Sequence, residues 1–338
     1  MKRRAVIENA IGETRAAVYE GKQLTELFAW RWSDNGKPRA GDIFSGRISR
    51  IEPSLGAAFV ELGFGPDGFL KFSNAPGAPR LTEGKYIHVL VTRDAAPGKG
   101  PILKFESMAS GQVKGPIQSK TLREFLEHKF VGIKIDEAAV NAVDVAVETE
   151  LAIPGGGSLA IERKRALTAI DIDKGGANSG FDVSLAACKL IASQLRLRGL
   201  GGLFVIDFPN LRQVKQREKI YHAMLKAFEG DSEPVKIAPM SRFGTIEMTR
   251  AKTCLSLDET LTDKYGEPTV ETQALYGLRQ LEREGRANGG AQLTLTLPPT
   301  VFEWLNEDTI VWREALTNRL GARFTLEQGE KMLIEADR

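Results

Sequence analysis

The sequence predicts a mixed α+β protein with more than one domain. Its 338 residues are 42% apolar, which is enough for a substantial buried core, and domains typically span roughly 100–200 residues. The first half is dominated by short alternating apolar runs typical of strands, whereas residues 183–229 hold two segments with the apolar spacing of amphipathic helices. These patterns favour a small β-barrel followed by an α/β domain.

The first half of the chain predicts mainly strands. Residues 5–30 indicate two or three strands joined by glycine-bearing turns. Residues 40–107 contain short strand-like runs separated by Gly and Pro clusters about every 8–12 residues, which favours a small closed barrel. A short helix over 119–130 and further strands over 143–170, with a glycine turn at 154–157, follow.

The second half predicts a strand, a crossover helix and a second strand, followed by a small terminal domain. The apolar runs ALTAI and GLFVI mark buried strands, and the helix expected over 183–202 ends with two arginines and a glycine. The polar segment 252–270 is expected to be a linker. The other expected elements are helices over 212–229, 271–285 and 299–320, and strands over 235–240, 244–250, 292–297, 324–328 and 331–337.

The charge is small overall but unevenly distributed. A net charge of +2 excludes a generic polycation such as a histone-like coat. Residues 1–130 carry 20 Lys and Arg against 14 Asp and Glu, whereas residues 131–338 carry 26 against 30. The basic first part indicates a polyanionic partner, and chance asymmetry is the alternative.

Cysteine usage and hydropathy favour a cytoplasmic protein without a membrane partner. Cys188 and Cys254 are far apart in the sequence, as expected for two reduced thiols, and with only three histidines the chain is not expected to build a structural zinc site alone. No apolar run approaches the roughly 20 residues that cross a bilayer, and the basic N-terminal tip precedes no apolar stretch of a signal peptide.

Two aspartates follow the two buried strands of the expected strand–helix–strand unit. Asp171 follows ALTAI and Asp207 follows GLFVI, so adjacent parallel strands would bring both carboxylates to one edge. Two such charges need a cation between them, and carboxylate oxygens suit Mg²⁺, with Mn²⁺ also acceptable. Asp173 would face the same side if the strand continues. The alternative is that Asp171 and Asp207 are ordinary strand-end turn formers or helix caps.

The expected barrel offers aromatic and basic residues that suit single-stranded nucleic acid. Small OB-type barrels bind single strands by aromatic stacking and basic side chains. Phe59 and Phe69 fall in adjacent strand segments, and the alternative is that both belong to the core. The basic candidates are Lys99, in the Gly-flanked loop PGKGP, together with Arg47, Arg50 and Lys71.

Four segments in the same order resemble the RNase E/G family of endoribonucleases. They are GRISRIEPSLGAAFVELGFGPDGFLKF (46–72), ALTAIDIDKG (166–175), QLRLRGLGGLFVIDF (194–208) and SRFGTIEMTR (241–250). The segment from TVETQALYGLRQLEREG onward also looks like that family's small domain.

The resemblance implies both an architecture and a set of site residues. It implies a split RNase H-like domain (1–38 and 111–150), an inserted OB-type RNA-binding barrel (39–110), a DNase I-like catalytic domain (151–251), a linker (252–270) and a small C-terminal domain (271–338). By motif, Asp171 and Asp207 would hold one magnesium ion that activates water for RNA cleavage, leaving 5′-phosphate ends. Phe59, Phe69 and Lys99 would contact single-stranded RNA.

The sequence departs from the family pattern in three places. Asp173 stands where the family usually has Asn, so we count it with Asp171 and Asp207 as a catalytic candidate whose extra charge could tighten magnesium or repel phosphate. The CPxCxG zinc-link is missing, since only Cys254 follows EMTR, so no zinc is expected and a homodimer would lack that bridge. Little chain separates PILKF from TLREFLEHKF, which leaves no room for the 5′-monophosphate sensor of the larger enzymes.

The leading hypothesis is a magnesium-dependent endoribonuclease that cleaves single-stranded RNA in rRNA or tRNA maturation or in mRNA decay. The alternative is an RNA-binding protein that cleaves weakly or not at all. A third class is a carbohydrate or nucleotide enzyme built on a similar sheet, which would act on small phosphates without RNA affinity.

Overall fold

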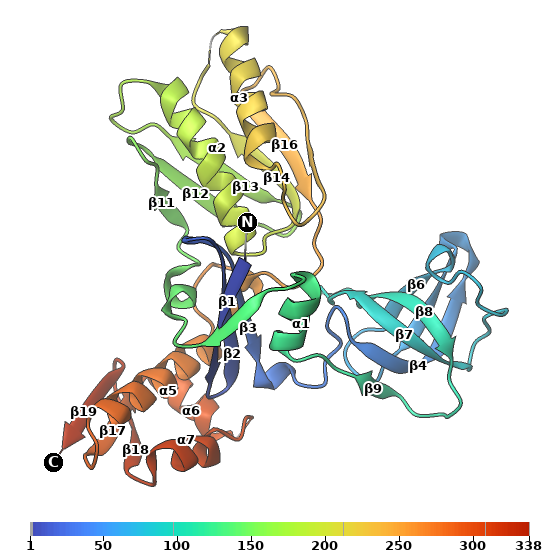
Figure 1. Cartoon of the computed structure of the whole chain (residues 1–338), viewed down its shortest axis with the longest axis vertical. Helices are drawn as coiled ribbons and strands as arrows, with labels where there is room; N and C mark the ends of the chain where they lie inside the picture. The colour runs from blue at the N-terminus through green and yellow to red at the C-terminus, as the bar shows by residue number, and fades with distance from the viewer. Residues whose placement is uncertain (1–2, 97, 212, 308, 338) are drawn as a thin grey trace. The chain divides into compact units, whose positions relative to one another are not determined.

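The computed structural model describes residues 3–96, 98–211, 213–307 and 309–337 (Figure 1). The chain forms two compact units, each treated separately below. The larger unit comprises Met1–Ser33, Lys134–Arg250 and Leu257–Arg338, and the smaller unit comprises Asp34–Ile133 and Ala251–Ser256. Across the described residues, no helix is both long and apolar enough to cross a membrane.

The smaller unit is a closed five-stranded barrel, as predicted. Its strands follow the order β5-β6-β8-β7-β4, pairing of β4 with β5 closes the ring, and β6 with β8 is the parallel pair. This topology is consistent with an OB-type barrel. The elements are β4 (Ile43–Glu52), β5 (Ala57–Glu61), β6 (Gly68–Lys71), β7 (Tyr86–Arg93), β8 (Ile102–Met108), β9 (Gly115–Gln118), α1 (Leu122–Lys129) and the 3-10 turns η2 (Pro53–Leu55) and η3 (Phe72–Asn74). The 3-10 turn η1 (Trp32–Asp34) lies where the chain passes from the larger unit to the smaller one.

The barrel interior is filled by every second residue of the strands. Ala58, Val60 and Leu70 are fully buried there, so the intervening Phe59 and the flanking Phe69 and Lys71 face outward. The helix predicted over 119–130 is α1, and a capping box fixes its start: the Thr121 hydroxyl accepts from the Glu124 N–H at 3.2 Å, while the Glu124 carboxylate accepts from the Thr121 N–H at 2.7 Å.

A six-stranded sheet in the larger unit contains the predicted strand–helix–strand motif. The strand order is β11-β12-β13-β14-β16-β15, and β13 and β14 are parallel and joined by α2. Figure 1 shows α2 and α3 side by side on one face of this sheet. The elements are β11 (Glu150–Ala152), β12 (Ser158–Arg163), β13 (Thr168–Asp173), α2 (Gly180–Leu197), β14 (Gly202–Asp207), α3 (Val214–Ala227), β15 (Val235–Ile237) and β16 (Thr245–Arg250).

The apolar residues of the sheet pack under these two helices. Ile170, Ile206 and Ile246 are adjacent in the strand register and buried beneath α2 and α3. Cys188 of α2 lies in the same core, and burial raises the pKa of its thiol to about 12, so the thiol stays protonated at neutral pH.

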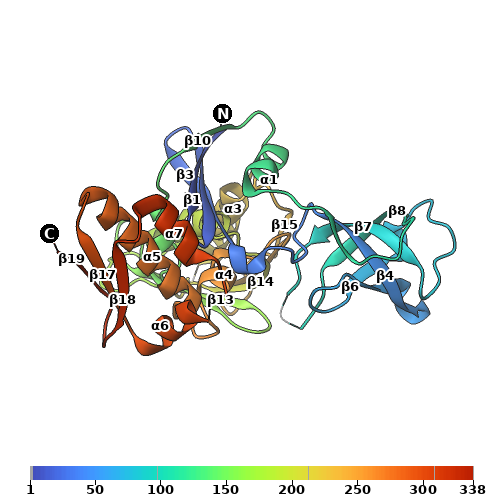
Figure 2. The same cartoon turned by 90° about the horizontal axis from the view of Figure 1, so that it is seen from below.

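The chain ends of the larger unit form two further sheets. Strand β10, which follows the barrel in sequence, pairs in parallel with β1 of the four-stranded sheet β10-β1-β2-β3. The barrel segment is therefore an insertion in the sequence between β3 and β10 of this sheet. The last residues form the three-stranded sheet β18-β17-β19 with α5, α6 and α7 (Figure 2). The elements are β1 (Arg3–Ala10), β2 (Glu13–Glu20), β3 (Gln23–Arg31), β10 (Lys134–Glu137), η4 (Asn141–Val145), α5 (Val270–Ala287), β17 (Gln292–Leu297), α6 (Pro299–Asn306), α7 (Trp312–Leu320), β18 (Phe324–Gln328) and β19 (Leu333–Asp337).

Two segments differ from the sequence expectation. The single helix predicted over 299–320 is wrong, because α6 ends at Asn306 and α7 begins at Trp312, whose indole N–H donates to the Leu305 carbonyl at 2.8 Å. The segment 252–270, expected as a linker, contains α4 (Leu257–Leu261), which buries both of its leucines against β3 and η4. Polar buried side chains, such as Asp258 beside Arg198, hide the apolar periodicity of this segment.

A buried ion cluster connects β2, η4 and α5. Arg15 donates to Glu13 at 2.6 Å and to Asp144 at 2.7 Å, and Arg279 of α5 donates to the same two carboxylates. Burial would raise the pKa of Asp144, but hydrogen bonds and charges from Arg15 and Arg279 outweigh it and hold that pKa below its ordinary value.

Candidate functional site

Asp171 and Asp207 are direct neighbours across two parallel strands. Their Cα atoms are register partners on β13 and β14, so the side chains leave the sheet on the same face from strands about 4.8 Å apart. Both side chains are exposed. The fold therefore places the two aspartates side by side on one face of the sheet, as the predicted pair of parallel strands requires.

The acids face away from the helices because the strand sequence alternates. In AIDID, Ile170 and Ile172 are buried beneath α2 and α3, whereas Asp171 and Asp173 are exposed on the opposite face. The strand does not end before the first aspartate, as the apolar run had suggested, but continues to Asp173. All three acids consequently share the face that α2 and α3 leave open.

Asp173 is held by the loop that follows its strand. Its Oδ1 accepts from the Gly175 N–H at 2.9 Å, an Asx turn that fixes the carboxylate at the end of β13. Its register neighbour is Ser158 on β12, on the side of β13 away from Asp207. Asp173 therefore flanks the acid pair without standing between its two members.

The acid pair suits Mg²⁺ better than it suits a metal ion whose ligands must all come from the protein. Within the described ranges, no group of three or more His, Cys, Asp or Glu side chains is arranged to hold a metal. Magnesium usually binds through one or two carboxylates and completes its shell with water and substrate phosphates. Two exposed carboxylates on neighbouring strands fit that requirement, and they supply too few ligands for a closed structural zinc site.

Phe59 and Phe69 lie together on the outer face of the barrel. They are register partners on β5 and β6, their ring centroids are 5.5 Å apart, and the rings meet edge to face at 63°. Arg50, the neighbour of Phe59 on β4, places its guanidinium carbon 4.4 Å from that ring centroid. Both rings are half-buried, whereas the adjacent Ala58 and Leu70 fill the interior, so the core alternative does not describe them.

Lys99 lies on the loop that leads into the strand beside Phe69. Its backbone pairs with Ala96 through hydrogen bonds of 3.0 and 2.8 Å, and its side chain is exposed. Two residues later, the Pro101 carbonyl accepts from the Phe69 N–H at 2.8 Å, which fixes this loop next to the aromatic pair. Arg47, Arg50 and Lys71 are exposed as well.

Strand register reveals neighbours that the sequence pattern does not. Thr245 of β16 is the register partner of Asp207 on the side opposite Asp171, and its hydroxyl lies 2.8 Å from the Ser241 hydroxyl. The segment SRFGT contains both hydroxyls, but only the antiparallel pairing of β14 with β16 places it beside the acids.

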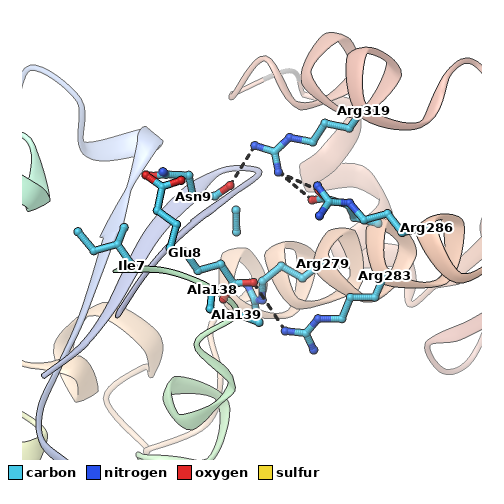
Figure 3. A pocket seen from close by; sticks show the side chains of 12 residues that line it. Ile7, Glu8, Asn9, Ala138, Ala139, Arg279, Arg283, Arg286 and Arg319 are labelled. Atoms are coloured by element: carbon cyan, nitrogen blue, oxygen red, sulfur yellow. Dashed lines mark hydrogen bonds and ion pairs between the residues drawn. The ribbon is translucent and has the colours of Figure 1, made fainter. Parts of the chain in front are cut away.

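A pocket of about 310 Å³ lies elsewhere in the larger unit and is rich in arginine. Figure 3 shows side chains from α5 and α7 facing Glu8 and Asn9 of β1. The side chains already engage one another: Arg319 donates to both Glu282 oxygens at 3.0 and 2.9 Å, and Arg286 also contacts Glu282. The four lining arginines face three lining glutamates, and the adjoining Glu13, Asp144 and Arg15 bring the cluster to five charges of each sign. This balance marks a structural ion network.

The described residues define a mixed α+β protein that combines a closed five-stranded barrel, consistent with an OB type, with an α/β sheet that carries two paired aspartates. A sequence model described as the Ribonuclease E/G family matches residues 116–253, which include both paired acids. Residues 116–253 therefore carry a ribonuclease E/G family domain.

Individual relatives agree with this assignment. The chain is 32% identical over 205 residues to Ribonuclease E of Escherichia coli strain K12, covering 56% of this chain and 19% of that protein. It is 30% identical over 184 residues to Ribonuclease G of Haemophilus influenzae, covering 50% of this chain and 38% of that protein. The matched region thus spans between about a fifth and two fifths of these relatives.

Proposed function

We propose that this protein is a magnesium-dependent endoribonuclease that hydrolyses phosphodiester bonds in single-stranded RNA and leaves 5′-phosphate ends. The observation that carries the proposal is the register pairing of Asp171 with Asp207 on an open sheet face. The names of the relatives support RNA as the substrate. We place the reaction in rRNA or tRNA maturation or in mRNA decay, as the sequence resemblance implies.

The chain's own residues would divide the work at the acid pair. Asp171 and Asp207 would hold a single Mg²⁺, or Mn²⁺ in its place, which when bound lowers the pKa of a coordinated water and neutralises charge on the attacked phosphate. Asp173, fixed by its bond to the Gly175 N–H, adds negative charge beside the pair and would orient groups near the scissile phosphate. The open sheet face is accessible to an extended single strand of RNA, because neither α2 nor α3 covers it.

The barrel would supply the affinity for RNA. Exposed aromatic and cationic side chains are the usual means by which OB-type barrels hold single strands without strict sequence preference. Phe59 and Phe69 present adjacent rings on which bases would stack. Arg50, whose guanidinium lies over the Phe59 ring, adds a positive charge there, and Lys99 would contact phosphate. Binding of this kind weakens as salt rises because phosphate contacts release counterions.

We expect this protein to act without two features of the larger family enzymes, the zinc-link and the 5′-sensor segment. Without the zinc-link or the 5′-sensor segment, any homodimer forms by other contacts, and the enzyme does not distinguish a 5′-monophosphate from a 5′-triphosphate. A large preference for the monophosphorylated substrate would contradict the second expectation. The split RNase H-like and DNase I-like domains, and a cytoplasmic location, belong to the same proposal.

A cleavage assay with purified protein tests the proposal. A labelled AU-rich oligonucleotide is incubated with Mg²⁺ or with EDTA, and the product ends are mapped. We expect the RNA to be shortened only when Mg²⁺ is present, and we expect the products to carry 5′-phosphate ends. Binding in a gel shift without shortening under any metal would replace the proposal with a non-catalytic RNA-binding protein, an alternative favoured by the Asp at position 173.

A further inference from the structure

We propose that Phe243, with Arg242 beside it, is a base-stacking platform that positions the RNA next to the acid pair. The inference rests on the proposed function and adds a substrate-contacting residue on the larger unit itself. Phe243 is 77% exposed, and the Arg242 guanidinium carbon lies 4.9 Å from its ring centroid. A single exposed aromatic is ordinary, so the inference depends on where this one lies and how it is held.

The turn that carries Phe243 is fixed by hydrogen bonds. The Ser241 hydroxyl accepts from the Phe243 N–H at 3.1 Å and from the Thr245 N–H at 3.4 Å. The Gly244 N–H donates to the Ser241 carbonyl at 3.1 Å, and Gly244 has a φ of 92°, which glycine adopts without strain. The aromatic ring is therefore presented from a structured turn between β15 and β16.

This turn adjoins the end of the strand that bears Asp207. Thr245, two residues after Phe243, is the register partner of Asp207 and shares its sheet face. The residue after Asp207 is Phe208, and its N–H donates to the Gly244 carbonyl at 3.4 Å. The turn therefore stays beside the chain as it leaves Asp207. A strand of RNA with a phosphate at the acid pair would place a neighbouring nucleotide at this turn.

The chemistry of the pair suits a nucleobase. Every base has a π-face, so stacking on an aromatic ring tolerates any sequence, and an arginine beside the ring adds a cation–π contact and a phosphate ligand. The nearest charges on this face are negative and come from Asp171, Asp207 and the exposed Glu247. A stacking contact with a flanking cation would hold the RNA where electrostatics alone would repel it.

Substitution at position 243 tests the platform, with binding measured separately from cleavage. Fluorescent single-stranded RNA is titrated against Asp207→Asn protein with and without Phe243→Ala or Phe243→Tyr. Values of kcat and KM are measured for the same two substitutions in the active protein. We expect Phe243→Ala to weaken binding about 5- to 150-fold, the range of one lost base stack. We expect Phe243→Tyr to restore binding, because the ring is retained.

Tyr265→Ala is the matched control. Tyr265 is 76% exposed, with the Lys264 ammonium 4.7 Å from its ring centroid, but it lies between α4 and α5 rather than on the turn between β15 and β16. We expect its affinity to stay within twofold of the parent. Unchanged binding in Phe243→Ala, equal losses in both variants, or no rescue by tyrosine would overturn the inference. Lack of cleavage by the wild type would refute the proposed function instead, since the binding comparison is made in protein that need not cleave.

Discussion

Removing one cation from the buried ion cluster should expose how strongly α5 is bound to the rest of its unit. Arg279 is only 2% exposed and serves both Glu13 and Asp144, whose other cation is Arg15. Arg279→Met keeps most of the apolar side-chain stem but leaves the buried Glu13 and the partly buried Asp144 sharing one guanidinium. Breaking a buried pair from one side typically costs about 3–5 kcal/mol, because the remaining charge stays desolvated. We expect a loss of that size in the free energy of unfolding.

Urea unfolding of the full chain, followed by far-UV circular dichroism, measures this loss. Arg283→Met is the control: Arg283 lies one helical turn further along α5, and its side chain is 37% exposed. It approaches Glu8 only to 3.8 Å and donates a hydrogen bond to the side chain of the exposed Asn141. Pairs of that kind contribute about 0–1 kcal/mol. Equal, small losses in the two variants would refute the reasoning that burial makes the Arg279 contacts expensive to break.

Three further outcomes follow from the same geometry. Because the pKa of Asp144 is lowered in the fold, its contribution to stability is present above the ordinary carboxyl pKa of about 3.9 and is lost as pH falls through the lowered value. Asp144→Asn should therefore destabilise the protein at pH 7 and flatten the acid side of a curve of unfolding free energy against pH. A variant curve that runs parallel to that of the wild type would contradict this. Changing Phe59 and Phe69 together to Ala should weaken single-strand binding by about 1–3 kcal/mol per stacked base, measured by fluorescence anisotropy, and unchanged affinity in folded protein would assign both rings a purely structural role. Asp173→Asn keeps an acceptor for the Gly175 N–H but removes a charge, so half-maximal cleavage should require more Mg²⁺, and an unchanged metal titration would exclude Asp173 from the metal's surroundings.

The local patterns of the sequence were sufficient to predict the acid-bearing strands. The alternation in AIDID and the apolar runs before Asp171 and Asp207 predicted two buried strands, and the crossover helix between them implied that they are parallel. The same alternation determines which face each acid occupies. The pairing of Asp171 with Asp207, rather than with a residue two positions away, required the register that the structure provides.

Features that depend on distant partners were not predictable from those patterns. Arg50 lies over Phe59 because β4 and β5 pair with a bulge, and Thr245 adjoins Asp207 because β16 inserts between β14 and β15. The helix predicted over 299–320 failed because its apolar spacing continues through a break that tertiary packing of Trp312 stabilises. Propensity describes single segments, and these features arise between segments.

The Mg²⁺ dependence of RNA cleavage in wild-type and Asp207→Asn protein tests the shared-ion site most directly. Rates are measured on one labelled single-stranded oligonucleotide over a range of Mg²⁺ concentrations, with RNA affinity recorded for both proteins. We expect saturable, metal-dependent cleavage by the wild type and none by Asp207→Asn, with RNA affinity nearly unchanged. Cleavage by Asp207→Asn at the wild-type rate and the same metal requirement would show that the carboxylates of β13 and β14 do not share the ion.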